Sequence, residues 1–96
     1  MRSNTTGSRN VAEGALALYW NTEGSSNTAI GMWSLNNATG SGNTAIGTQS
    51  LVTQTRGNFN LAAGLGAGSN LSIGSNNIFL MSPGVDGDTD TIRIGQ

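Results

Sequence analysis

The sequence predicts an all-β fold in which short parallel strands stack into a β-roll, or solenoid, of 16- to 17-residue coils. Two observations carry this prediction. The pentapeptide Asn-Thr-Ala-Ile-Gly occurs at residues 27–31 and returns unchanged at residues 43–47. In addition, Gly, Ser, Thr and Asn make up just over half of the chain, which favours either a flexible low-complexity segment or a repetitive fold built from turns. A period of 16 is too short for a pair of helices and fits two short strands with two turns.

Looser copies of the pentapeptide flank the two identical ones, so we expect strands at residues 10–14, 27–31, 43–47 and 60–64. A fragment with the same pattern at 70–74 follows too soon, which leaves the boundary of the fourth coil open. The recurring Gly permits a positive φ at the corners, and Asn tolerates that conformation better than most residues. Helix is the competing interpretation for the Ala- and Leu-rich stretch before Trp20, but the spacing of the glycines keeps it too short to hold by itself.

Side chains alternate along a strand, so Ile30 points to one face of its strand and Ala29 to the other. We expect the larger side chains to be buried and to stack from coil to coil at a spacing of about 4.8 Å. The expected core ladder consists of Ile30 over Ile46 and Leu35 over Leu51. The small Ala29 and Ala45 then form a thin second face.

The two ends of the repeat array depart from the pattern. Glu13 stands where Ile30 and Ile46 stand, as expected of a capping repeat. At the other end, residues 77–80 and 91–95 alternate in polarity and are joined by a turn-rich stretch, which predicts a β-hairpin that closes the solenoid. The predicted buried face of this hairpin is formed by Ile78, Leu80, Ile92 and Ile94. We therefore divide the chain into head repeats at 1–76 and a hairpin cap at 77–96.

One chain offers too few large apolar side chains to stabilise its coils by itself. A 16-residue coil such as residues 27–42 carries only four of them, and each ordered residue costs conformational entropy. Solenoids packed side by side in a homo-oligomer would bury the remaining apolar surface. The small alanine face suits such a contact, so the candidate subunit interface comprises Ala29, Ala45 and Trp33.

The residue types that are missing exclude several functions. The chain has no Cys and no His, which removes disulfides, thiolate nucleophiles, imidazole bases and the usual zinc and copper ligands. It has no Lys, and its four Arg are scattered, so no basic patch for phosphates is expected. No apolar run approaches the roughly 18 residues of a transmembrane helix, and the N-terminus lacks a secretory signal pattern. We expect a non-enzymatic protein without cofactors or metals, without a nucleic-acid partner and without direct insertion into a membrane.

Two groups of acidic residues are candidates for chemistry. The stretch Asp86-Gly87-Asp88-Thr89-Asp90 has carboxylates at alternate positions, as a calcium loop does, but Thr91 stands where the EF-hand loop needs Gly. A solvated acidic turn is the favoured interpretation. Glu13 and Glu23 are candidates for a carboxylate pair in glycoside hydrolysis, but no cleft is expected to hold them.

The repeated strand resembles the YadA-like head repeat, or haemagglutinin-type repeat, of trimeric autotransporter adhesins. The resemblance is carried by residues 27–31 and 43–47 and by the turns at 4–7 and 37–40, and it covers roughly residues 4–74. The Thr-Ile-Arg-Ile-Gly ending at 91–95 is similar to endings that follow such repeats in large bacterial surface proteins and some phage tail-fibre-like proteins. The resemblance implies a left-handed parallel β-roll in which three chains associate about one axis as a homotrimer.

Together these features predict a structural and adhesive head segment of a trimeric bacterial surface adhesin, located outside the cell at its surface. The expected partners are copies of the chain itself and a host extracellular matrix protein or surface glycan. Two alternatives stay open: a shaft or receptor-binding segment of a phage-like tail fibre, and a carbohydrate-binding module that uses Tyr19, Trp20 and Trp33. Tyr19 and Trp20 form the candidate ligand surface, although aromatic residues more often serve packing.

Overall fold

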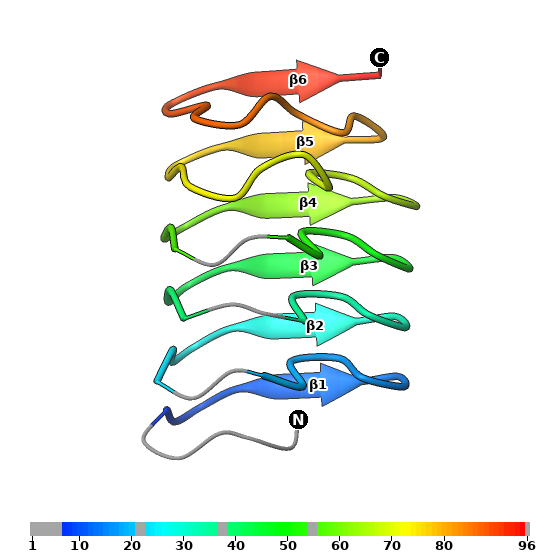
Figure 1. Cartoon of the computed structure of the whole chain (residues 1–96), viewed down its shortest axis with the longest axis vertical. Helices are drawn as coiled ribbons and strands as arrows, with labels where there is room; N and C mark the ends of the chain where they lie inside the picture. The colour runs from blue at the N-terminus through cyan, green and yellow to red at the C-terminus, as the bar shows by residue number, and fades with distance from the viewer. Residues whose placement is uncertain (1–6, 21–22, 37–38, 54–55, 96) are drawn as a thin grey trace.

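The computed structural model of the chain is an all-β solenoid of about five turns (Figure 1). The structure describes residues 7–20, 23–36, 39–53 and 56–95, and no helix occurs in these ranges. One six-stranded sheet runs the length of the molecule, and every neighbouring pair of strands is parallel. The strands are β1 (Val11–Glu13), β2 (Thr28–Ile30), β3 (Thr44–Ile46), β4 (Leu61–Ala63), β5 (Ile78–Leu80) and β6 (Ile92–Ile94).

The strands recur with the predicted period. Equivalent positions in successive coils are 16 or 17 residues apart up to β5, and the last coil has only 14 residues. The fragment at 70–74 is not a strand of this sheet. Its Ile73 instead forms an isolated parallel bridge with Arg56, outside the six named strands.

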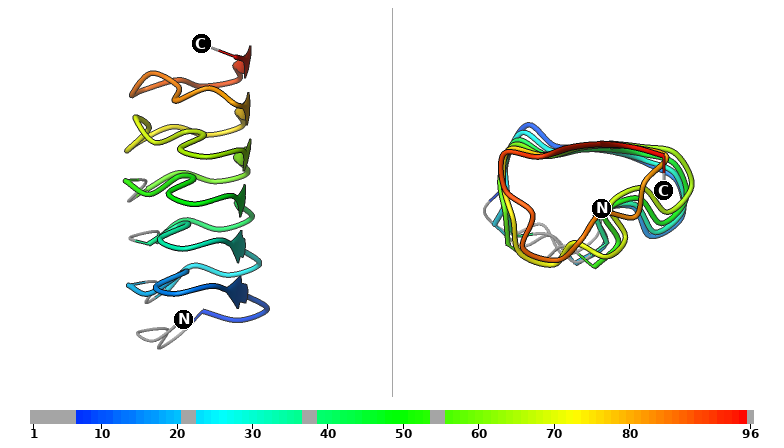
Figure 2. Two further views of the ribbon diagram at one scale, coloured as in Figure 1. Left: turned by 90° about the vertical axis from the view of Figure 1, so that its right-hand side faces the viewer. Right: turned by 90° about the horizontal axis from the view of Figure 1, so that it is seen from above.

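The coils wind in one direction, which the views of the ribbon show together. The strands line one side of the solenoid and all run the same way, and the loops return along the other side (Figures 1 and 2). Seen from above, the chain turns clockwise as it rises toward the viewer and its C-terminus (Figure 2). A coil that turns clockwise while it approaches the viewer is left-handed.

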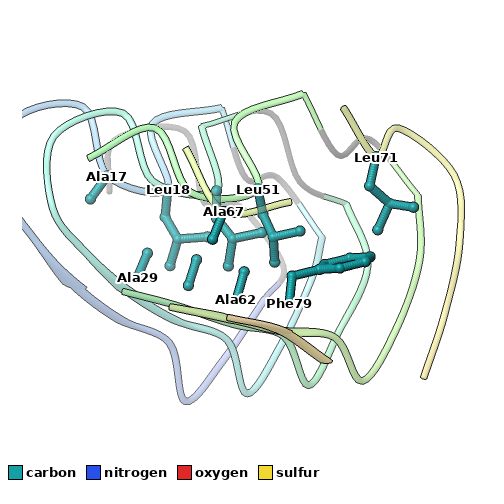
Figure 3. Close-up of a cluster of buried hydrophobic side chains, with 10 residues drawn as sticks. Ala17, Leu18, Ala29, Leu51, Ala62, Ala67, Leu71 and Phe79 are labelled. Carbon is teal, nitrogen blue, oxygen red and sulfur yellow. The ribbon is translucent and has the colours of Figure 1, made fainter. Parts of the chain in front are cut away.

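The interior of the solenoid is narrow and is filled by small residues from the sheet and leucines from the opposite wall. The central residue of each strand points inward, and Ala29, Ala45 and Ala62 are completely buried. Figure 3 shows Ala29 and Ala62 on the sheet side of the core, with Leu18 and Leu51 on the other. The core thus contains Leu35 and Leu51, as the sequence led us to expect.

The expectation for Ile30 and Ile46 is wrong. Both side chains point outward from the sheet and are 38% and 43% exposed, whereas their neighbours Ala29 and Ala45 are fully buried. Strand alternation requires Ala and Ile to lie on opposite faces, but it does not determine which face is inside. The leucine on the opposite wall already fills each coil, so the sheet side has room for a methyl group only.

Close stacking of the coils explains the glycine that follows each of the first four strands. Gly31 and Gly47 both have a φ of +123°, which disfavours any L-residue. A Cβ atom on Gly31 would lie 2.6 Å from the carbonyl carbon of Gly47, and one on Gly47 would lie 2.6 Å from the carbonyl oxygen of Gly64. Glycine is therefore required by backbone conformation and by space.

Asparagines immediately before β1 to β5 connect the coils; Asn10 is partly buried and the other four are buried. The Oδ1 atom of each accepts the backbone N–H of the equivalent residue in the next coil at 2.9 to 3.0 Å. The Nδ2 atom donates to a backbone carbonyl at the corner of the following coil, as from Asn27 to Gly40 and from Asn43 to Gly57. We call these residues the asparagine ladder; it comprises Asn10, Asn27, Asn43, Asn60 and Asn77.

The C-terminal residues do not form the predicted hairpin. β5 and β6 are parallel, with Phe79 opposite Arg93, so residues 81–90 make a shortened coil and not a reversal. β6 thereby continues the sheet of the head repeats across the boundary drawn at residues 76 and 77.

The predicted buried face of this segment is also inverted. Phe79 is completely buried, Ile78 and Leu80 are partly exposed, and Ile92 and Ile94 are 68% and 76% exposed. Phe79 fits where β1 to β4 carry alanine because Gly68 and Gly84 lie against its ring. A Cβ atom on either glycine would lie 3.0 to 3.1 Å from a ring carbon of Phe79.

Candidate interaction surface

The outward-facing residues of the six strands form one continuous face, which we call the outer sheet face. Glu13, Thr28 and Thr44 are its polar members among the described residues, and all others are aliphatic. The outer sheet face comprises Val11, Glu13, Thr28, Ile30, Thr44, Ile46, Leu61, Ala63, Ile78, Leu80, Ile92 and Ile94.

The polarity of the outer sheet face changes along the solenoid. β1 presents Val11 beside the charged Glu13, and β2 and β3 each present a threonine beside an isoleucine. From β4 to β6 every outward side chain is aliphatic. A continuous exposed aliphatic face is a candidate interaction site.

The turns after the strands extend this apolar surface. Met32, Leu65 and Met81 each lie within two residues of a strand end and are 47%, 73% and 63% exposed. Trp33, in the same turn as Met32, is 39% exposed and has a φ of +66°. Trp33 is thus partly exposed in a single chain, and its place in a subunit interface stays a prediction.

The alanines of the predicted interface are not accessible. Ala29 and Ala45 are completely enclosed within the coils, so they cannot touch another chain. They are enclosed because the strands turn inward the face that was predicted to point outward. The residues that occupy the accessible face in their place are the isoleucines that had been assigned to the core, Ile30 and Ile46.

Tyr19 and Trp20 form an aromatic pair in the first coil. Their ring centroids are 4.7 Å apart and the ring planes make an angle of 87°, an edge-to-face contact. Trp20 is 53% exposed, whereas Tyr19 is partly buried. Trp20 therefore presents apolar surface to solvent next to a phenol, but neither ring belongs to the outer sheet face.

The acidic turn near the C-terminus binds other parts of the chain. Asp86 Oδ1 accepts hydrogen bonds from the backbone N–H groups of Ser72 and Ile73, at 2.9 and 3.1 Å, and from the Ser72 hydroxyl at 2.8 Å. Asp88 is held by Arg93 through two hydrogen bonds, Nε to Oδ2 at 2.6 Å and Nη2 to Oδ1 at 2.9 Å. Asp86 thus fastens the last coil to the one before it, whereas Asp88 and Arg93 bind each other within the last coil.

These contacts lower the pKa of both carboxyl groups. The pKa of Asp86 lies below its usual value mainly because the Ser72 N–H, followed by the Ile73 N–H, donates to the ionised form. The hydrogen bonds from Arg93 are the main cause of the lowered pKa of Asp88, and the same pair raises the pKa of Arg93. Both carboxylates are therefore engaged as structural acceptors.

The described part of the chain contains no group of three or more carboxylates placed to hold a metal ion. Glu13 and Glu23 are both exposed, and no pocket is found among the described residues. No helix in these ranges has the length and apolar character needed to cross a membrane. The outer sheet face is thus the feature best suited to an interaction.

No family model, curated protein or solved structure matches this chain, so the comparisons assign no family to it.

Proposed function

We propose that this chain is a structural and adhesive head segment of a trimeric bacterial surface adhesin, in which three copies pack their outer sheet faces around a common axis. The observation that carries the proposal is the outer sheet face itself. It is aliphatic along most of its length, and Ile30, Ile46, Ile92 and Ile94 are all substantially exposed in a single chain.

A second and a third copy of the chain are the occupants that this face fits best. The spacing of its side chains is set by the coil repeat, so an identical copy aligned in parallel meets each rung with an equivalent rung. An antiparallel copy would instead bring Glu13 against the aliphatic rungs near Ile94, where an unpaired carboxylate is costly. Parallel packing leaves the three Glu13 side chains together at one end, in contact with water.

The repeat resemblance and the left-handed winding agree with three chains about one axis. In such an assembly the corner and loop residues on the far side of each coil remain available to ligands. Three identical surfaces would raise avidity beyond that of a single weak contact. The ligands we propose are a host matrix protein or a surface glycan, met outside the cell.

The subunit contact is tested by substitution of one outward isoleucine, with a matched control. Ile46→Lys places a charge in the middle of the outer sheet face and is expected to yield monomers by light scattering. Ile73→Lys makes the same change at a side chain of comparable exposure, 55%, outside the six-stranded sheet. This control is expected to keep the mass of the unaltered protein. Equal masses for the two variants would refute the assignment of the interface.

The adhesive role is tested separately on the assembled protein. Immobilised matrix proteins and a glycan array are probed with the unaltered trimer and with the Ile46→Lys monomer. Binding by the trimer that falls at least tenfold in the monomer is expected from multivalency. A trimer that binds neither class of ligand would leave a purely structural role and contradict the adhesive one.

A carbohydrate-binding module remains the second candidate because Trp20 offers an exposed ring beside Tyr19. Stacking of a sugar on this ring predicts that Trp20→Ala abolishes glycan binding while the mass stays unchanged. Loss of assembly on the same substitution would show that Trp20 serves subunit packing.

A further inference from the structure

The last coil carries a different residue from the earlier coils at three equivalent positions. The first is the asparagine ladder, where Thr91 follows Asn77. The Thr91 N–H still donates to Asn77 Oδ1 at 3.0 Å, but its own hydroxyl donates to the carbonyl of Thr89 at 2.9 Å. Thr91 therefore lacks the amide with which each asparagine engages both the next strand and the next corner.

The second position is the corner to which each ladder asparagine donates. Asn43 and Asn60 donate to the carbonyls of Gly57 and Gly74, whereas Asn77 donates to the carbonyl of Asp88 at 2.7 Å. Glycine at this corner has a steric reason, since a Cβ on Gly74 would overlap the carbonyl oxygen of Asp88 in the following coil. Asp88 carries a side chain at this position, so the carbonyl of a further coil would be blocked there.

A clash of the same kind occurs two coils earlier. A Cβ on Gly40 would overlap the carbonyl oxygen of Gly57. Residues 40 and 74 therefore require glycine because another coil follows each of them, and among the described corners to which a ladder asparagine donates only the last does not use glycine.

The third position is the inward-facing centre of the strand. Arg93 stands opposite Phe79 in the register of β5 and β6, where β2, β3 and β4 present alanine. Its guanidinium is bound by the Asp88 carboxylate, and the side chain keeps 39% of its surface exposed. A further coil would cover this charged pair and remove it from water at a high desolvation cost.

We propose that the last coil is a terminating cap, in which Asp88, Thr91 and Arg93 together prevent any further coil from stacking on β6. The excluded partner is a strand of the same repeat, whether it is appended to the chain or belongs to the β1 end of a second copy. β6 would otherwise offer an open backbone edge, and such edges promote end-to-end association. The cap rests on the fold alone and does not depend on the proposed trimer.

The test attaches one more coil to the C-terminal end. Residues 48–64 carry the chain from the end of β3 to just past β4, so a copy placed after Gly95 supplies one complete turn and one strand. The same copy inserted after Gly64 is the matched control, because there it lies between two glycine corners. A third chain combines the C-terminal copy with D88G/T91N/R93A, which restores the corner glycine and the ladder asparagine of the earlier coils and the central alanine of β1 to β4.

Amide hydrogen exchange of the added strand, followed by NMR, is the readout. We expect the strand to exchange like an unstructured peptide at the native end, and about 100-fold more slowly in the internal copy and in the D88G/T91N/R93A chain. Protection at the unaltered end would overturn the proposal, as would exposure at the restored end while β5 and β6 stay protected. If the triple substitution unfolds the last coil, the comparison is made between the two chains that lack it. Equal exchange of the added strand at the native C-terminal end and at the internal site would then overturn the cap.

Discussion

Asn43 bridges two successive coils with both ends of its side-chain amide: Oδ1 accepts the Asn60 N–H at 3.0 Å and Nδ2 donates to the Gly57 carbonyl at 2.9 Å. Asn43 is completely buried, so these partners replace water. Asn60 repeats the arrangement toward Asn77 and Gly74. The solenoid is therefore held together by a polar ladder at one corner as well as by its apolar core.

Replacement of Asn43 by Ala is expected to destabilise the fold strongly. It would leave the buried N–H of Asn60 and the carbonyl of Gly57 without this partner, at about 1 to 3 kcal/mol for each unsatisfied group. Urea unfolding followed by circular dichroism measures the loss. Asn58→Ala is the control, because Asn58 Oδ1 accepts the Ser41 N–H at an exposed corner, and it should cost about 1 kcal/mol or less.

The stacked glycines predict a contrast between two glycine-to-alanine changes. Gly47→Ala sets a Cβ against the Gly64 carbonyl at a φ of +123° and should cost more than about 2 kcal/mol. Gly87 also has a positive φ, +91°, but a Cβ there meets nothing within 4 Å. Gly87→Ala should therefore show the conformational cost alone, about 1 kcal/mol. Similar losses in thermal unfolding would mean that the coils are less closely stacked.

The orientation of the strands is tested at Ala45 and its neighbour. Ala45→Leu adds three carbons to a filled interior and is expected to cost about 1 to 3 kcal/mol or more. Ile46→Leu changes the shape of an outward side chain and should alter the unfolding free energy of a single chain by about 0.5 kcal/mol or less. The opposite order of effects would place Ile46 inside.

Much of the fold follows from the sequence because the repeat is short and nearly exact. Two identical pentapeptides 16 residues apart set the coil length, and the glycines mark where strands end. The sequence did not predict which face of each strand points into the core, because the alternation in Thr28-Ala29-Ile30 is compatible with either orientation. Only the volume between the sheet and the wall that contains Leu35 determines that Ala29 lies inside.

The C-terminal coil was mispredicted for a related reason. The strands at 78–80 and 92–94 were recognised, but the turn-rich segment between them resembles the connection of a hairpin. It instead encircles the core because Asp86 accepts the N–H groups of Ser72 and Ile73, a long-range contact with no local signal. The asparagine ladder did carry a signal, since Asn recurs at the same point of five coils, but it was interpreted as a turn preference.

Acid should loosen the last coil first. The pKa values of Asp86 and Asp88 are lowered in the folded protein, so their contribution is present above the unfolded value of about 3.9 and is lost as the pH falls through the folded values. Amide exchange in residues 85–94 is therefore expected to accelerate as the pH falls below about 4, before that of β2 and β3. The double variant D86N/D88N should lose this pH dependence, and an unchanged profile would contradict it.

Three copies packed around one axis would cover the exposed aliphatic face of each chain. The most direct test is the mass of the unaltered protein in solution by light scattering, with circular dichroism on the same sample. A mass near three times 9.8 kDa with a β spectrum is the predicted result. A folded β monomer at micromolar concentration, with Ile30, Ile46, Ile92 and Ile94 open to solvent, would contradict it.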